Sequence, residues 1–181
     1  AADAMPWAEL LASFNAQTAR DFEVIALTRG TAPDDLASPA PRIGFRLTVF
    51  DVGPGAGWSA PRTAATKRAQ GRYVAFLGEH VLPDRDFVRC TLQHIRQAHP
   101  SGLRGRVLCE GRVSHPIRFD LGPEMRHAAC DIDELCVFDK ETFFRLGGFP
   151  AMPFDHGAIQ LSCRLYADPH EGRRSILYCP D

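Results

Sequence analysis

The residues best placed to do chemistry lie in one short loop, Gly78-Glu79-His80, which follows the apolar run Tyr73–Leu77. A carboxylate beside an imidazole can bind a divalent ion, and a site with a nitrogen ligand suits manganese better than magnesium, which prefers oxygen. The loop after a buried strand is also where open α/β sheets place their ligands. The sequence therefore offers Glu79 and His80 as metal ligands, and an ordinary loop histidine is the alternative for His80.

The elements on either side of this loop are predicted from residue type and pattern. Residues Arg62–Gln70 are rich in helix formers, and Ser59 and Pro61 before them suit a helix start. Gly71 suits the left-handed residue that ends a helix. The run YVAFL at Tyr73–Leu77 is typical of a parallel strand that is buried on both faces. We expect a helix, a turn, a strand and then the loop.

The rest of the chain alternates between further helices and strands, which helical spacing, capping residues and period-two alternation identify. The predicted helices are Met5–Ala19, a helix capped by Asp84 that runs to about Ala98, one from Asp139 through Leu146, and Phe154–Tyr166. The predicted strands are Phe22–Leu27, Phe45–Phe50, Leu103–Glu110, the start of Leu135–Phe149, and Ser175–Pro180. A Gly147-Gly148 turn free to take positive φ follows the third helix. Without repeats or a linker, residues 1–181 are expected to form one domain.

Composition narrows the classes of function. The 181 residues are 45% hydrophobic and 24% charged, which is enough to build a full core. The net charge of -1 gives no support to a nucleic-acid partner. We find no apolar stretch of membrane-spanning length and no leader. The six cysteines include no CxxC pair, which favours free thiols in a reducing cytoplasm over a disulfide framework or a zinc site.

The stretch from Arg62 to Pro83 resembles the nucleotide-sugar-binding segment of family 2 glycosyltransferases. The matching residues are Arg62, Ala69, Gly71, Tyr73, Val74, Phe76, Leu77 and Pro83. The helix and strand near the start are similar to the family at Leu11, Ser13, Gln17, Phe22, Glu23, Val24, Ile25 and Gly30. A later strand–helix segment of the family resembles residues Leu135–Phe149, LCVFDKETFFRLGGF. Further matches follow at Leu161, Arg164 and Leu165.

The acidic residues of the family are substituted at three places. Its Asp-x-Asp is Gly78-Glu79-His80 here, and two aspartates at the end of an earlier strand are Thr28 and Arg29. The acids of its later helix fall at Gly157, Ala158 and Gln160. The resemblance implies an α/β fold of the GT-A type, with a mixed, mainly parallel sheet flanked by helices. The family's first strand has no counterpart before the first helix, so we expect it to be missing.

The resemblance implies a hexosyltransferase, which transfers a sugar from a nucleotide-sugar donor to a glycan, lipid or small-molecule acceptor. Such transfer needs counter-charge on the leaving nucleoside diphosphate, a base for the acceptor hydroxyl and a fixed geometry. The donor-binding candidates are Arg29, Gly30, Arg62, Glu79 and His80, of which Glu79 and His80 would hold Mn or Mg. Asp155 is the candidate base, or else a helix N-cap. The other candidate bases are Asp131, Asp133, Glu134 and His156.

A second interpretation stays open because the family's acids are substituted. The chain could be a catalytically degenerate module that binds a ligand, a protein partner or a second copy of itself. A guanidinium at Arg29 cannot accept a base N–H, although it suits a phosphate or carboxylate. A deep groove at Gly78–His80 with bound metal would favour the enzyme, whereas a groove filled by Arg29 or Trp58 would favour the module. Another Rossmann-type nucleotide binder is disfavoured, since no Gly-rich fingerprint is present.

Overall fold

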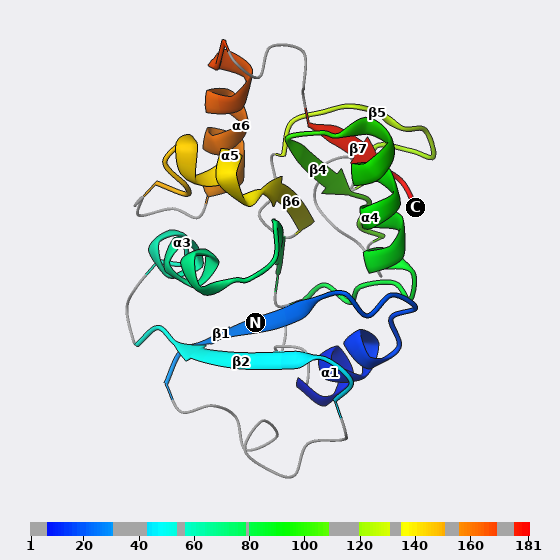
Figure 1. The fold of residues 1–181 in the computed structure, drawn as a ribbon, viewed down its shortest axis with the longest axis vertical. Coiled ribbons are helices and arrows are strands. Elements are labelled where there is room, and N and C mark those ends of the chain that lie inside the picture. Colours follow the sequence, from blue (N-terminus) through cyan, green and yellow to red (C-terminus); the bar gives the residue numbers. More distant parts are fainter. Residues whose placement is uncertain are drawn as a thin grey trace.

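The computed structural model of the chain describes residues 7–30, 43–53, 57–78, 80–108, 120–130, 135–150, 156–169 and 176–181. Its helices are α1 (Trp7–Asn15), α3 (Ser59–Arg68), α4 (Phe87–Ala98), α5 (Lys140–Arg145) and α6 (Gly157–Ala167). Its strands are β1 (Glu23–Thr28), β2 (Arg46–Asp51), β3 (Tyr73–Leu77), β4 (Gly102–Gly105), β5 (Arg126–His127), β6 (Leu135–Asp139) and β7 (Leu177–Cys179). Figure 1 shows their arrangement.

The strands of the described ranges form two sheets. β1 and β2 pair in parallel over their whole length. The larger sheet has the order β3-β6-β4-β7-β5, in which β4 and β7 are parallel and the other neighbours are antiparallel. The prediction of a mainly parallel sheet is therefore wrong for this sheet. β3 and β4 do run the same way, but β6 lies between them in the opposite direction, and an apolar run does not reveal the direction of its neighbour.

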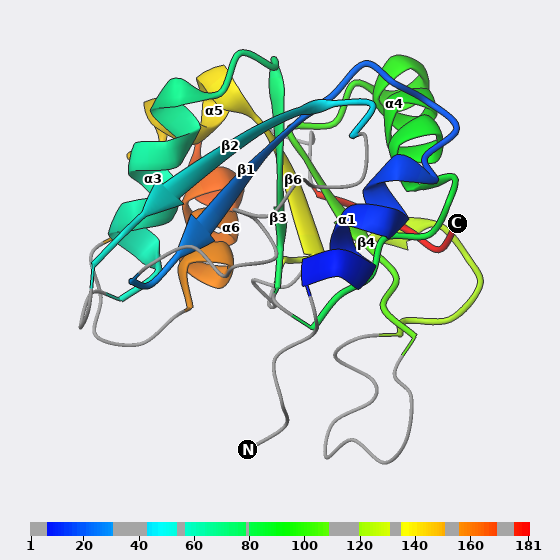
Figure 2. The ribbon, with the colours of Figure 1, turned by 90° about the horizontal axis from the view of Figure 1, so that it is seen from below.

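Helices cover both faces of the sheets. Figure 2 shows α3, α5 and α6 on one side of the strands and α1 and α4 on the other. The main core cluster lies under α5 and α6, where the Phe143 ring is 5.2 Å from that of Phe149 and 5.5 Å from that of Phe76, between centroids. Among the described helices, none is long and apolar enough to cross a membrane.

Strand β3 is less enclosed than its sequence predicts. Of its five residues only Phe76 is buried, and Ala75 is exposed. β3 pairs with β6 along one edge and does not pair with β1 in the described part of the chain. Among the described residues, what the sequence predicts as one sheet is therefore two, and β1 and β3 are the strands at which they approach each other (Figure 2).

Helix α3 differs from its prediction at both ends. It begins at Ser59, so Pro61 lies within its first turn, where a missing N–H costs nothing. It ends with Ala69 in an extended conformation, at φ −60° and ψ 137°. Gly71 does not take a positive φ, so its prediction as a left-handed helix end is wrong.

Helix α5 forms as its sequence predicts. The Asp139 side chain accepts a hydrogen bond of 3.0 Å from the Thr142 N–H and caps the helix. Gly147 and Gly148 follow with φ of 88° and 65°, values that glycine adopts without strain. This turn lets Phe149 fold back onto the Phe143 ring.

Helices α1, α4 and α6 and strands β4 and β7 are shorter than predicted, whereas β1 and β2 keep their predicted length and begin one residue later. α1 ends at Asn15 because Gln17 turns inward, donating to the Asp84 carbonyl at 2.6 Å and accepting from the Val88 N–H at 3.0 Å. Asp84 does not cap α4, since its carboxylate accepts from the Asp86 N–H in the preceding turn. The remaining predicted elements are found as β1, β2, β4, β7 and α6, with 109–119, 151–155 and 170–175 outside the described residues.

Candidate functional site

The loops that follow several strands lie along one edge of the sheets. β3 and β4 are both antiparallel to β6, and β7 is parallel to β4, so these three strands end on the same side. Figure 2 shows β1 and β3 running in the same general direction, towards the lower side of the view. This carboxyl edge therefore carries the segments after β1, β3, β4 and β7, as in open α/β proteins that bind ligands there.

At one end of this edge the residue after β1 contacts the residue before α3. The Arg29 guanidinium lies over the Trp58 ring, with Cζ 4.3 Å from the ring centroid. α3 packs against β1, which brings the two residues together although they are far apart in sequence. Such a cation–π contact is worth about 0.5–2 kcal/mol. Arg29 is thus held against an aromatic face, a contact that its sequence context does not predict.

Asp51, the last residue of β2, fixes the backbone on both sides of this contact. Its Oδ1 accepts a hydrogen bond of 3.0 Å from the Gly30 N–H and another of 3.0 Å from the Gly53 N–H. The two glycines have φ of 87° and 70°. Gly30, a predicted donor-binding residue, therefore has a defined position. Asp51 is not among the site residues predicted from the sequence, although an acidic residue directly before a glycine-rich loop is a signal for one.

Two buried hydroxyl groups flank the same contact. Thr28 is 6% exposed and Ser59 is 2% exposed, and each is the sequence neighbour of one member of the Arg29–Trp58 pair. In the described part of the chain neither side-chain oxygen has a hydrogen-bond partner. Such groups cost free energy and need an explanation, of which a ligand is one. Nothing in the sequence predicts them, because burial depends on the packing of α3 against β1.

The other predicted site residues are placed in part. His80 is exposed in the turn after β3, where the Val81 N–H donates to the Gly78 carbonyl at 3.2 Å. Arg62 lies one turn after Trp58 in α3, and its backbone N–H donates to the Trp58 carbonyl at 2.9 Å. Glu79 and Asp155 are outside the described residues, as are the alternative bases at 131, 133 and 134. His156 occupies the N-cap position of α6.

The described residues do not form a preformed metal site. Among these residues, no group of three or more His, Cys, Asp or Glu side chains could hold a metal ion. Of the predicted metal ligands only His80 is described, and one exposed imidazole is not a complete set of ligands.

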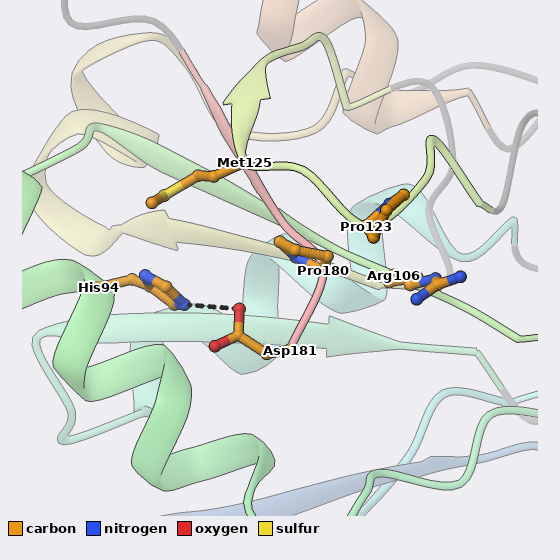
Figure 3. A pocket seen from close by; sticks show the side chains of 6 residues that line it. All are labelled: His94, Arg106, Pro123, Met125, Pro180 and Asp181. Carbon is orange, nitrogen blue, oxygen red and sulfur yellow. Dashed lines mark hydrogen bonds and ion pairs between the residues drawn. The ribbon is translucent and has the colours of Figure 1, made fainter.

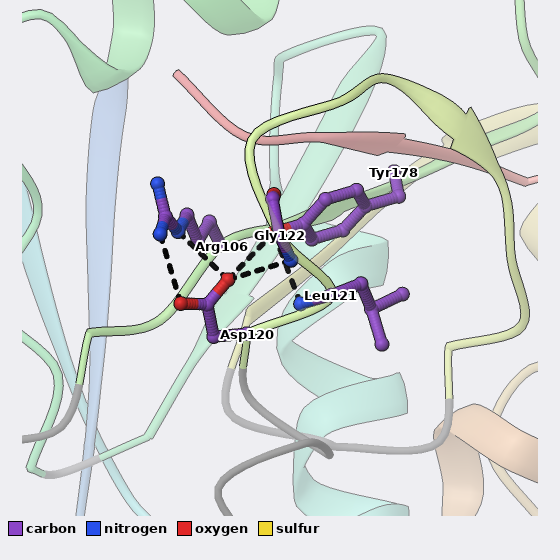
Figure 4. A network of polar contacts seen from close by, with 5 residues as sticks. All are labelled: Arg106, Asp120, Leu121, Gly122 and Tyr178. Carbon is purple, nitrogen blue, oxygen red and sulfur yellow. Dashed lines mark hydrogen bonds and ion pairs between the residues drawn. The ribbon is translucent and has the colours of Figure 1, made fainter.

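Further along the carboxyl edge, an ion pair and a tyrosine hold residues 120–122, which precede β5 (Figure 4). Arg106 donates from Nε and Nη2 to the two carboxylate oxygens of Asp120, at 2.9 and 2.8 Å. These hydrogen bonds, with one from the Gly122 N–H, lower the pKa of Asp120 below its ordinary value. The fully buried Tyr178 donates its hydroxyl to the Gly122 carbonyl at 2.9 Å and accepts from the Leu121 N–H at 3.2 Å. Burial raises the pKa of Tyr178, which keeps this hydroxyl protonated.

The model of the family described as glycosyl transferase family 2 matches residues 7–152. The chain belongs to this family. No curated protein matches the chain.

Similarity to solved structures shows which fold this family 2 chain has. S. aureus TarS 1-349 aligns with a TM-score of 0.72 and 18% identity, over 96% of this chain and 53% of that one. TarS 1-349 in complex with UDP-GlcNAc has a TM-score of 0.71 at 18% identity and covers 96% and 52%. The mannosyltransferase PcManGT from Pyrobaculum calidifontis, in complex with GDP-Man and Mn²⁺, has a TM-score of 0.67 at 16% identity and covers 96% and 50%. The GT-A fold is thereby confirmed, and the chain spans about half the length of these structures.

Proposed function

We propose that this family 2 chain binds a nucleotide-sugar donor and transfers its sugar to an acceptor hydroxyl. The observation that supports the proposal is the pair of buried hydroxyls of Thr28 and Ser59 without a described partner, which adjoin Arg29 and Trp58 at the carboxyl edge. Both oxygens are covered in this structure, so polar atoms of a bound nucleotide would reach and satisfy them only after the residues over them move. The indole face would stack on the base, and the guanidinium would pair with a phosphate.

The leaving nucleoside diphosphate needs counter-charge in the transition state. We assign this to the guanidinium groups of Arg29 and Arg62, whose planar forks suit phosphate oxygens. PcManGT is seen with GDP-Man and Mn²⁺, and a divalent ion would supply further positive charge when bound. In this chain Glu79 and His80 would hold it together with the diphosphate. One or two protein ligands are enough for an ion that the phosphates also bind.

The acceptor hydroxyl must lose a proton as it attacks the sugar. We propose Asp155 as the general base, since a carboxylate within hydrogen-bond reach of the hydroxyl can take that proton. Asp155 precedes His156, which occupies the N-cap position of α6.

The five described cysteines are free thiols, which supports the proposed cytoplasmic location. We further propose that residues 1–181 act as one domain, in keeping with a family match over residues 7–152.

The second candidate function is a module that binds a ligand or protein partner without catalysis. The Arg29–Trp58 contact favours it, because the guanidinium covers the aromatic face on which a base would stack. In the enzyme this contact must open or slide when the donor binds, and in the module it stays closed. Trp58 therefore reports on the difference between the two functions.

The test combines calorimetry with fluorescence. UDP, GDP and their sugars are titrated with and without manganese into the protein and into a Trp7→Phe variant, in which Trp58 is the remaining tryptophan. We expect a dissociation constant between about 1 μM and 1 mM, the usual range of enzyme KM values, with a change in Trp58 fluorescence. Release of nucleoside diphosphate in the presence of acceptor glycans then measures transfer.

Matched variants identify the groups responsible. A Glu79→Ala/His80→Ala double variant should lose the metal-dependent part of donor binding, whereas His127→Ala, an exposed histidine of β5, should not. Arg29→Gln should weaken binding of a diphosphate, and Arg96→Gln on α4 should have no effect. Donor binding without transfer to any acceptor would favour the module. If folded protein binds no nucleotide, the proposed function is refuted.

A further inference from the structure

Asp51 is a carboxylate at the candidate donor site to which the proposed function gives no role. It is the last residue of β2, and because β2 runs parallel to β1, it lies at the carboxyl edge. In the register of the two strands Asp51 is opposite Thr28. The backbone is fixed there as well, since the Val52 N–H donates to the Thr28 carbonyl at 2.9 Å. The pairing of the two strands therefore places this carboxylate beside the end of β1.

One oxygen of the Asp51 carboxylate is held in place and the other has no partner. Oδ1 accepts from the N–H groups of Gly30 and Gly53, each at 3.0 Å, whereas Oδ2 accepts no hydrogen bond within the described ranges. The two bonds orient the carboxylate before any ligand arrives, which reduces the entropy that binding costs. Oδ2 is therefore a positioned acceptor for a ligand hydroxyl or N–H.

Two other described carboxylates on this side of the sheets already have side-chain partners. Both oxygens of Asp120 accept hydrogen bonds from Arg106, at 2.9 and 2.8 Å (Figure 4). Oδ1 of Asp181 lies 3.2 Å from Nε2 of His94 (Figure 3). The hydrogen-bond partners of Asp51 are backbone N–H groups, and no described side chain forms an ion pair with it. Asp51 is thus the carboxylate of the three that has no side-chain partner.

A ligand can reach Asp51 in this structure, because its side chain is exposed. Thr28, its neighbour in the register, is 6% exposed, and the Thr28 hydroxyl has no hydrogen-bond partner in the described part of the chain. A buried hydroxyl without a partner costs free energy. It is a separate observation that supports a polar ligand at this place. Such a ligand would contact Asp51 before the residues that cover Thr28 move.

The chemistry of a nucleotide decides which part of it suits Asp51. A carboxylate repels the diphosphate, which the proposed function assigns to Arg29 and Arg62. The base is assigned to the face of Trp58, where it would stack. The ribose has no partner in that assignment, and each of its hydroxyls can donate a hydrogen bond to a carboxylate oxygen. In α/β folds that bind dinucleotides, an acidic residue binds a ribose hydroxyl in this way.

We propose that Asp51 accepts a hydrogen bond from a ribose hydroxyl of the donor nucleotide, an inference that rests on the proposed function. Strand β2 would then supply a carboxylate at the place where β1 ends in Thr28 and Arg29. Asp51 would hold the nucleoside end of the donor while the arginines hold the diphosphate. It would also make the site selective for ribonucleotides over deoxyribonucleotides, because a deoxyribose leaves the positioned oxygen without its donor.

The test compares ribonucleotides with their deoxy forms. Calorimetry gives the dissociation constants of UDP and GDP, and then of the 2′-deoxy and 3′-deoxy forms of whichever binds more tightly. We expect the parent to bind the ribonucleotide about tenfold more tightly than one of the deoxy forms, the loss expected for one hydrogen bond to a carboxylate. In Asp51→Ala this ratio should fall to about one. A purely structural role of Asp51 would weaken both nucleotides by the same factor and leave the ratio unchanged.

Two further variants complete the comparison. Asp51→Asn keeps an oxygen that can accept from the N–H groups of Gly30 and Gly53, so it carries the test if Asp51→Ala does not fold. A hydrogen bond between neutral groups is weaker than one to a carboxylate, so its ratio should lie between those of the parent and Asp51→Ala. Asp21→Ala removes an exposed carboxylate before β1, at the opposite end of that strand, and should keep the ratio of the parent.

The outcomes separate this inference from the proposed function. If nucleotides bind and the ratio is the same in the parent and in the Asp51 variants, the inference alone is overturned, and Asp51 only fixes the backbone or accepts from a base N–H. A parent that binds the ribonucleotide and both deoxy forms equally overturns it as well. If the folded parent binds no nucleotide, the proposed function fails and the inference fails with it.

Discussion

Replacing Tyr178 by phenylalanine tests how residues 120–122, which precede β5, are held. The hydroxyl donates to the Gly122 carbonyl at 2.9 Å and accepts from the Leu121 N–H at 3.2 Å. It also lies 3.4 Å from Oδ1 of Asp120, the carboxylate that binds Arg106. Phenylalanine keeps the buried ring and removes only these contacts, so the change isolates the contribution of the hydroxyl.

The magnitude follows from the number of groups left without a partner. Each hydrogen bond contributes about 0.5–1.5 kcal/mol, and a buried group that loses its partner costs about 1–3 kcal/mol. Both partners are half-buried backbone groups, so water replaces part of the loss. We therefore expect Tyr178→Phe to lower the free energy of unfolding by about 2 kcal/mol. For a chain of 181 residues this lowers Tm by roughly 4–8 °C.

Urea denaturation followed by circular dichroism measures this change, with the m-value as a check that the same surface is exposed on unfolding. Tyr166→Phe is the control, since the Tyr166 side chain is 46% exposed and its hydroxyl has no hydrogen bond in the described part of the chain. We expect that variant to stay within about 0.5 kcal/mol of the parent. If Tyr178→Phe does the same, the hydroxyl does not hold this segment and the reasoning is refuted.

Three further predictions concern the core, the sheet and acid stability. Phe143→Ala should lower the free energy of unfolding by about 3–5 kcal/mol, because it removes a fully buried ring. If urea denaturation of the folded variant gives a free energy of unfolding within about 1 kcal/mol of the parent's, the ring does not contribute to the core as described. Gly105→Ala should cost about 1–3 kcal/mol in the same assay, since its Cβ would lie 2.2 Å from Leu135 Cδ2; an unchanged midpoint would show that Leu135 moves freely. Because the bonds from Arg106 lower the pKa of Asp120 below 3.8, its stabilisation is complete above that pH and is lost as the pH falls through the lower, folded-state pKa. Urea unfolding at a series of pH values should show a smaller loss at low pH for Asp120→Asn, and an identical pH profile would contradict the assignment.

The fold could largely be predicted from the sequence because local patterns determined most elements. YVAFL predicted β3 with its correct ends, and Asp139 with Gly147-Gly148 predicted the start and end of α5. In each case residues close in the chain specify the structure by themselves, through a cap, a turn or an apolar run. The resemblance of these segments to family 2 glycosyltransferases predicted a GT-A fold, which the family match and the solved structures confirm.

The candidate site depended on the tertiary structure. The sequence predicted Arg29 and Gly30 at the end of a strand, but only the packing of α3 against β1 brings Arg29 onto Trp58 and buries the hydroxyls of Thr28 and Ser59. The direction of β6 was equally hidden, because it depends on which distant segments become its neighbours. The sequence by itself thus determined the elements and their family, through interactions between nearby residues. Which polar groups share an edge, and which of them lack a partner, was decided by contacts between residues far apart in the chain.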